Sequence, residues 1–287
     1  MTSTRFNPSP PDRGRGWVRG LVVFAVVMML AWSAEAEVPL TLTGNAAEGG
    51  LLVGKTAPGA AVAIDGKPVM TDAVGNFLLG FGRDDAGTKR LTVSSNGETL
   101  NREIIVTDRD FKIERIDGLP QKKVTPDPEA IKRIVKEKAE MAEAKKLTDP
   151  SAYFLSGFAW PATGRISGVY GSQRVLNGKP RRPHYGTDVA APIGTPVVAM
   201  AAGKVTFVHP GMFFNGKTVL IDHGLGLRSV YIHLSDTDVK AGDKVGKGTR
   251  IGAIGKTGRA TGPHLHFGLT LDEIPIDPEL ILGEMPK

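Results

Sequence analysis

Cysteine is absent from the 287 residues of this chain. Its absence excludes disulfide scaffolds, thiolate zinc sites, iron–sulfur clusters, cysteine nucleophiles and lipid anchors attached to cysteine. Histidine is also scarce, with six residues in the whole chain. Any metal site must therefore be built from histidine and carboxylate side chains.

Aromatic residues are few as well, at 6%, whereas glycine occurs 36 times. Frequent glycine and sparse aromatics indicate many tight turns, which are typical of mainly β proteins rather than of helix bundles. With 41% hydrophobic and 23% charged residues, the chain is expected to be globular rather than disordered. Its length suggests about two domains.

The longest unbroken apolar run, Leu21 to Trp32, is shorter than the roughly 20 residues that cross a bilayer comfortably. Arg13, Arg15 and Arg19 lie shortly before this run, and the small residues Ala34 and Ala36 follow it at the positions that a signal peptidase reads. Residues 1–36 are therefore predicted to be a signal peptide that is cleaved after Ala36. The alternative is an uncleaved N-terminal anchor.

The formal charge of +6 and the isoelectric point near 9.4 permit anionic partners without naming one. Residues 1–36 contain four arginines and two acidic residues, so the rest of the chain carries +4. That charge gives only mild attraction to an anionic polymer, and no nucleic-acid partner is expected. An exported chain without cysteine indicates the periplasm or cell envelope, with no permanent membrane span once the signal is removed.

Short β-rich runs alternate with turn signals over residues 37–118. Asp65-Gly66 and Asn96-Gly97 lie between such runs and supply the positive φ angles that two-residue hairpin turns require. This spacing predicts a small N-terminal β-sandwich domain. The segment has no cluster of titratable groups, so an accessory or structural role is expected, with binding of the wall or of a partner as the alternative.

A linker with a charged helix is predicted over residues 119–150. Asp127 is a good N-cap, Pro128 suits the first helical position, and the helix should run from Glu129 to Lys146. Its apolar stripe is expected to consist of Ile131, Ile134, Val135 and Ala142. Two interpretations are open: a solvated linker helix that rests on one domain, or a helix that shields an active cleft and regulates access to it.

The third segment, residues 151–287, again shows strands separated by glycines and contains all six histidines. A continuous strand is expected from Thr195 to Val208. Two of the histidines, His209 and His223, adjoin turn signals and are interpreted as turn residues.

The sequence His264-Leu265-His266-Phe267 is the most informative motif of this segment. Residues two apart on a strand project from the same face, so both imidazoles would share one space while Leu265 and Phe267 pack behind them. Such a pair can hold a divalent metal, or one histidine can bind while its neighbour transfers protons. The alternative is two strand histidines on a polar face.

His184 and Asp188 are four residues apart, and Gly186 between them argues against a helix. On a strand they would form half of a metal site, although such a pair can also be incidental. Tyr231 and His233 are likewise expected to share one strand face.

Together these residues indicate a catalytic zinc site. His184, Asp188 and one histidine of the His-Leu-His motif supply three protein ligands and leave a fourth position for water. Zinc lowers the pKa of bound water, and the remaining histidines can move a proton or hold an oxyanion. A site of this kind can hydrolyse peptides or esters. No HExxH motif occurs, so the architecture differs from that of the HExxH enzymes.

Several ordered blocks of sequence between residues 157 and 281 resemble the M23 (lysostaphin/LytM-type) family of zinc peptidoglycan endopeptidases. The matching text comprises HYGTDVAAPIGTPVVA from His184, VLIDHGLGLRSVYIHL from Val219 and VKAGDKVGKGTRIGAIGKTGRATGPHLHFG from Val239. The resemblance implies a β-sheet cleft for residues 151–287. With the small β-sandwich and the linker helix that the residues themselves predict before it, the chain is expected to be mainly β.

The resemblance also implies the roles of individual residues. His184, Asp188 and His266 would ligate one Zn²⁺ per chain. His233 and His264 would be catalytic, activating water or stabilising the transition state, and Tyr231 would assist the oxyanion. Spacing alone does not divide His264 and His266 between these roles.

The activity implied is that of an exported zinc metalloendopeptidase that hydrolyses peptide cross-links of peptidoglycan through zinc-activated water. D-Ala–diaminopimelate cross-links are expected, with Gly-Gly bridges as an alternative. Some relatives have lost metal ligands and activate cell-wall amidases, so a non-catalytic activator is the second interpretation, and an amidase or envelope regulator is a further candidate partner. All five key positions are filled here, which favours an enzyme.

A carrier domain is the third interpretation, because Ala241 to Gly248 also resembles lipoyl and biotinyl hairpins. The attachment lysine of those hairpins is missing, and a carrier would not explain the histidines.

Overall fold

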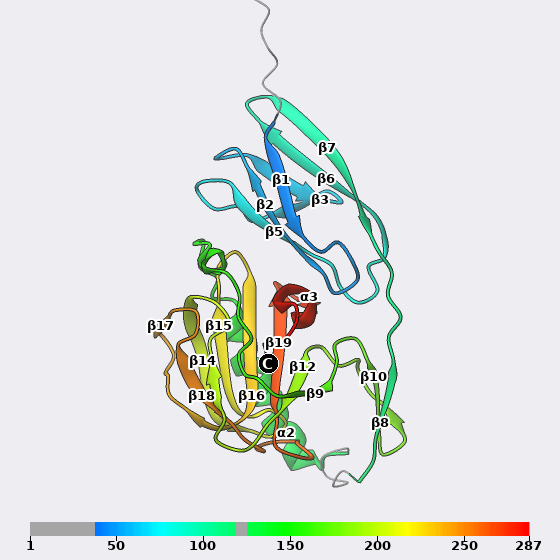
Figure 1. Ribbon diagram of the computed structural model, residues 1–287, viewed down its shortest axis with the longest axis vertical. Coiled ribbons are helices and arrows are strands. Elements are labelled where there is room, and N and C mark those ends of the chain that lie inside the picture. Colours follow the sequence, from blue (N-terminus) through cyan, green and yellow to red (C-terminus); the bar gives the residue numbers. More distant parts are fainter. Residues whose placement is uncertain (1–37, 119–124, 287) are drawn as a thin grey trace, which may run out of the picture. The chain divides into compact units, whose positions relative to one another are not determined.

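A computed structural model describes residues 38–118 and 125–286 (Figure 1). The fold is mainly β, as the composition predicts. The predicted signal peptide lies outside the described residues. Within those residues, no helix combines the length and apolarity needed to cross a membrane.

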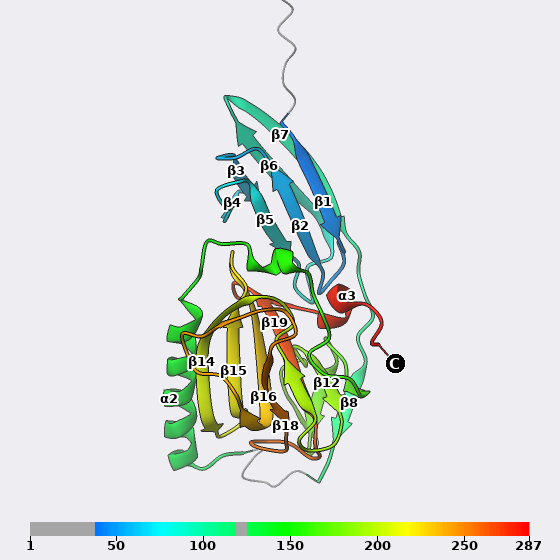
Figure 2. The same ribbon diagram turned by 60° about the vertical axis from the view of Figure 1, so that its left-hand side comes forward.

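Two antiparallel sheets form the first part of the described chain. One has the order β1-β2-β5 and the other β4-β3-β6-β7 (Figures 1 and 2). The strands are β1 (Leu40–Gly44), β2 (Leu51–Thr56), β3 (Ala61–Ile64), β4 (Lys67–Val69), β5 (Asn76–Gly80), β6 (Gly87–Ser95) and β7 (Glu98–Val106). Phe77 and Leu91, one from each sheet, are fully buried in a shared core. The predicted β-sandwich is confirmed.

Both predicted hairpin turns are present in this sandwich. Asp65 and Gly66 join β3 to β4 with φ angles of 47° and 76°, and Asn96 and Gly97 join β6 to β7 with 51° and 84°. Asparagine, aspartate and glycine tolerate the left-handed region at little cost, which is why these dipeptides are informative in a sequence.

The outer face of the β1-β2-β5 sheet contributes to the core of the C-terminal part. Leu51 and Leu78 belong to the same buried cluster as Leu271 and Ile276. A Cβ atom on Gly80 would lie 2.8 Å from Cδ1 of Ile276 and 3.2 Å from Cβ of Leu271, so a larger residue here would displace these side chains. Residues 37–287 form one compact unit, and the domain boundaries expected at 118 and 150 stay predictions.

The segment that follows the sandwich pairs with a distant strand. β8 (Ile113–Ile116) lies parallel to β10 (Gln173–Leu176), whose other neighbour is β11 (Lys179–Pro180). This pairing brings Glu114 to the part of the chain that contains the histidines.

Helix α2 (Pro128–Lys145) begins as predicted, with the Asp127 carboxylate accepting a hydrogen bond from the Ala130 amide at 2.8 Å. It runs beside β14 (Gly203–Met212) (Figure 2).

The expected apolar stripe of α2 is wrong except for one residue. Ile131 and Val135 are 49% and 61% exposed, and Ala142 is exposed too. The buried residues are Ile134, Glu137 and Ala144. Glu137 can be buried because Arg133 pairs with one carboxylate oxygen at 2.6 Å and the Phe213 amide donates to the other at 2.8 Å. These two interactions of Glu137 therefore determine which face of the helix is covered.

A ten-stranded sheet forms the C-terminal part, with the main order β17-β14-β15-β16-β19-β12-β9. Besides β14, its strands are β9 (Arg165–Gly168), β12 (Thr187–Ala190), β13 (Pro196–Val198), β15 (Gly216–Asp222), β16 (Leu227–Thr237), β17 (Lys244–Val245), β18 (Arg250–Ile254), β19 (Leu265–Leu271) and β20 (Ile274–Ile276). Two short helices accompany them, η1 (Tyr153–Ser156) and α3 (Pro278–Leu282). The strand expected from Thr195 to Val208 is divided into β13 and β14.

The two histidines interpreted as turn residues differ. His209 lies inside β14, opposite Thr218, so the turn interpretation is wrong for it. The Pro-Gly signal after it corresponds to a register shift between His209 and Met212 rather than to a turn. His223 does follow the end of β15, but it is fully buried. Its Nδ1 lies 2.8 Å from the Ala202 carbonyl oxygen and its Nε2 lies 2.7 Å from Oγ of Ser229.

Candidate metal centre

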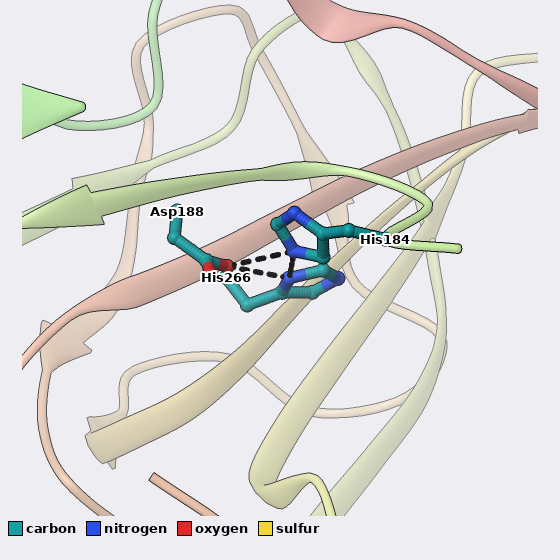
Figure 3. A group of neighbouring side chains, drawn as sticks. All are labelled: His184, Asp188 and His266. Atoms are coloured by element: carbon teal, nitrogen blue, oxygen red, sulfur yellow. Dashed lines mark hydrogen bonds and ion pairs between the residues drawn. The ribbon is translucent and has the colours of Figure 1, made fainter. Parts of the chain in front are cut away.

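Neighbouring strands bring three predicted ligands together. Asp188 on β12 lies directly opposite His266 on β19 in the antiparallel register. His184 precedes β12, and the chain between them passes so close to β19 that a Cβ atom on Gly186 would lie 2.5 Å from the Phe267 carbonyl oxygen. Glycine at this position therefore allows the chain after His184 to pass close to β19. The His184 side chain points toward Asp188 and His266 (Figure 3).

The three side chains converge on one point (Figure 3). Nε2 of His184 lies 2.8 Å from Nδ1 of His266 and 3.0 Å from Oδ1 of Asp188. Nδ1 of His266 lies 2.7 Å from the same carboxylate oxygen. His184 and Asp188 are buried, and His266 is partly buried.

The tautomer of His184 suits a metal ligand. Its Nδ1 lies 3.0 Å from the Val169 carbonyl oxygen, which can only accept, so Nδ1 carries the hydrogen and Nε2 carries a lone pair. Metal-binding histidines commonly donate their other ring nitrogen in this way. Two imidazole lone pairs and one carboxylate form a donor set typical of zinc, so the three residues fit that metal.

The electrostatics keep the cluster ready to bind a cation. Burial by itself would raise the pKa of Asp188, but the adjacent imidazole rings of His184 and His266 hold that pKa well below the ordinary value. Burial lowers the pKa of His266 to about 4, although Asp188 opposes this shift. At neutral pH Asp188 is therefore a carboxylate and His266 an unprotonated imidazole, the forms that bind metal.

A second carboxylate oxygen fixes the orientation of Asp188. Its Oδ2 accepts a hydrogen bond from Nη2 of Arg174 at 2.5 Å. Nε of Arg174 in turn donates to Oε2 of Glu114 on β8 at 3.0 Å. The Asp188 carboxylate is thus held at both oxygens, one toward the two histidines and the other toward a guanidinium.

His233 and His264 lie together beside these ligands. Their ring centroids are 4.8 Å apart, and the His233 ring is 6.4 Å from that of His266. Nδ1 of His233 lies 2.8 Å from the Thr257 carbonyl oxygen, and Nδ1 of His264 lies 2.9 Å from that of Gly262. Both Nδ1 atoms therefore donate, and both Nε2 atoms carry lone pairs that can accept a proton. Burial lowers the pKa of His233 to about 3, which keeps its ring neutral.

Tyr231 does not join this group, and its expected common face with His233 is wrong. The Tyr231 side chain is fully buried opposite Phe267, and its hydroxyl accepts a hydrogen bond from the Met200 amide at 3.0 Å. His233 has a φ angle of 65°, a left-handed conformation that interrupts strand alternation. The interruption turns His233 toward the other histidines while Tyr231 stays in the core.

Leu265 and Phe267 pack behind the His-Leu-His motif as expected, and both are fully buried. Sequence reasoning missed Arg174, Glu114 and the carbonyl groups that orient the imidazoles. Backbone carbonyls carry no residue signal. The Arg174–Glu114 pair spans 60 residues, so only strand pairing reveals it.

Comparison with known proteins agrees with this geometry. Residues 182–278 match the model of Peptidase family M23. The peptidoglycan DD-endopeptidase ShyA of Vibrio cholerae is 47% identical over 97 residues, which cover 33% of this chain and 22% of that protein. The cell division protein DipM of Caulobacter vibrioides is 32% identical over 165 residues, covering 55% and 26%. The alignments thus span about a quarter of the length of these relatives.

One solved structure matches most of the chain. A crystal structure from Pseudomonas aeruginosa that carries the peptidase M23 designation has a TM-score of 0.63 and 31% identity. The match covers 83% of this chain and 96% of that one, so it includes the sandwich as well as the histidine-bearing sheet. The chain belongs to peptidase family M23.

Proposed function

We propose that this protein is a zinc metalloendopeptidase that hydrolyses peptide cross-links of peptidoglycan. The observation that carries the proposal is the convergence of His184, Asp188 and His266 beside a second histidine pair with acceptor Nε2 atoms. A site for zinc alone would not require that pair. Membership of a peptidase family supports the same reaction class.

Zinc bound by the three ligands would act as a Lewis acid toward the scissile carbonyl and the attacking water. His233 or His264 accepts a proton from the water at Nε2, and the imidazolium so formed can donate a proton to the leaving amine. His233 is the weaker candidate for this step, because burial lowers its pKa to about 3. The Thr257 and Gly262 carbonyls hold the Nδ1 hydrogens throughout, so each ring keeps the orientation that the transfer needs.

D-Ala–diaminopimelate cross-links are the proposed substrate. Support comes from the relatives named peptidoglycan DD-endopeptidases, ShyA and ShyB, which are 47% and 43% identical over 97 residues. Gly-Gly bridges are the alternative. The arginines, apolar run and alanines of residues 1–36 support export to the periplasm or cell envelope.

The test uses purified protein and isolated cross-linked peptidoglycan, with the released muropeptides identified by mass spectrometry. Conversion of dimers to monomers by cleavage at D-Ala–diaminopimelate bonds is expected. A chelator should abolish this conversion, added zinc should restore it, and His184→Ala should lack it even with zinc. Full activity in chelator would contradict the zinc mechanism.

A second outcome is distinguishable in the same assay. If the protein alone releases nothing but accelerates a wall amidase, the non-catalytic activator is supported instead. The similarity to a cell division protein gives a reason to repeat the assay with a wall amidase present.

A further inference from the structure

The sheet face that carries His266 continues as a groove toward α2. One cavity, of about 140 Å³, has His266 and Ile232 in its lining on the sheet side and Met141 and Lys145 on the α2 side. Four residues of its lining, among them Arg228, also line a larger cavity of about 570 Å³ under α2. Helix α2 is therefore a wall of a groove that leads away from the metal ligands.

Arg228 has unused hydrogen-bonding capacity in this groove. Its side chain is almost entirely enclosed, with 4% exposure for the residue. Nη2 donates to Oγ1 of Thr148 at 2.5 Å, and Nη1 has long contacts of 3.3 and 3.5 Å to the carbonyl oxygens of Gly226 and Asp272. Its Nε has no hydrogen-bond partner. Across residues 38–118 and 125–286, no ion pair is formed by this arginine.

An enclosed guanidinium with no carboxylate oxygen within ion-pair distance is unusual, because buried charges are normally paired. Asp222, opposite Arg228 on β15, interacts with it electrostatically but does not form such a pair. Arginine favours a planar anion that can accept two parallel hydrogen bonds, and a carboxylate has that geometry. Lys145 brings a second cation to both cavities. The cavity next to His266 has no acidic residue in its lining, whereas Glu137, Asp272 and Glu273 line only the larger one.

The distance along the sheet suits a peptide that lies in the groove. Ile232 lies opposite His266, and Arg228 lies opposite Thr270, so four residues of β16 separate the two positions. Four strand residues span about 13 Å. An extended peptide covers that length with about four residues.

We propose that Arg228 and Lys145 form a carboxylate subsite that binds the stem peptide of the substrate several residues from the scissile bond. Stem peptides carry free carboxylates on γ-linked glutamate and on diaminopimelate, which match this cationic pair. The proposal rests on the proposed function for the identity of the peptide. It also assigns α2 a part in substrate binding.

The test measures binding without hydrolysis. Chelator-treated protein is titrated calorimetrically with a soluble cross-linked muropeptide dimer, and with the same dimer whose carboxylates are converted to carboxamides. The wild-type protein should bind the carboxylate form about tenfold more tightly. Arg228→Gln and Lys145→Gln should each remove most of this preference. Lys136→Gln, on an α2 residue outside both linings, is the matched control and should retain it.

Equal binding of the two dimers, no binding of either, or full preference in the Lys145→Gln variant would overturn the subsite. Lys145→Gln keeps the test valid should the buried Arg228 be needed for folding, because Lys145 is only partly buried. Hydrolysis is measured separately with zinc restored. A protein that prefers the carboxylate dimer but cleaves nothing would refute the proposed function and leave the subsite standing.

Discussion

Arg174 on β10 and Asp188 at the predicted metal centre form a 2.5 Å hydrogen bond. Glu114 on β8 holds Arg174 from the other side. The residues after the sandwich thus help to orient a metal ligand. This relationship gives the accessory part of the chain a physical link to the site.

Replacing Arg174 with glutamine is expected to lower zinc affinity about 10- to 100-fold, the range found for residues that orient metal ligands. The variant removes a positive charge near the site, but lost orientation of Asp188 should outweigh that gain. Competition with a zinc-binding dye measures the effect. Arg165→Gln, an exposed arginine on β9, is the control. Unchanged affinity in Arg174→Gln would show that Asp188 needs no support.

The His233→Ala and His264→Ala variants are expected to bind zinc with stoichiometry close to one. Their turnover should fall about 10²- to 10⁴-fold, because a positioned proton acceptor is lost. Metal analysis and muropeptide release are measured on the same samples. If either variant loses its zinc, that histidine is a ligand and the division of roles implied by the family resemblance is wrong.

Tyr231→Phe should leave turnover nearly unchanged, because the hydroxyl lies in the core and not at the metal centre. Removing it deprives the Met200 amide of its acceptor, so the free energy of unfolding should fall by about 1–2 kcal/mol. Chemical denaturation and turnover are compared with the wild type. A large loss of turnover with unchanged stability would restore Tyr231 as a catalytic residue.

His223 should make stability depend on pH. Burial lowers its pKa from 6.5 to about 4, so between these values the unfolded chain binds a proton that the folded chain does not. Its contribution is fully present above pH 6.5 and is lost as pH falls toward 4, by roughly 3 kcal/mol. Denaturation of His223→Gln and of the wild type at several pH values gives the difference. If the free energy of unfolding depends on pH in the same way in both proteins, the lowered pKa of His223 is contradicted.

Deleting residues 128–146 tests three interpretations of α2: a linker helix, a helix that shields the cleft, and a groove wall that contacts the substrate. A helix that only shields the cleft should raise turnover when removed, whereas a groove wall should lower the affinity for substrate. Turnover and KM on soluble muropeptide dimers separate these results. Unchanged values would leave α2 as a linker and would contradict the shielding interpretation.

Local features of the fold could be read from the sequence with good accuracy. The Asp-Gly and Asn-Gly turns, the Asp127 cap and the alternation around the His-Leu-His motif each depend on a few neighbouring residues. His184, Asp188 and His266 could be nominated because spacing and residue chemistry agree. Errors arose where a distant contact overrode the local pattern. Glu137 rotates the covered face of α2 by pairing with Arg133 and Phe213, and the conformation of His233 separates it from Tyr231.

The sequence by itself determined the chemistry that is available: no thiolates, six histidines and the residue types of a zinc hydrolase. Tertiary structure decided which groups meet and which nitrogen of each imidazole faces the site. Val169, Thr257 and Gly262 act through backbone carbonyls, and Arg174 and Glu114 meet only because β8 pairs with β10. Such contacts depend on strand register between segments far apart in the chain, which residue identity alone does not specify.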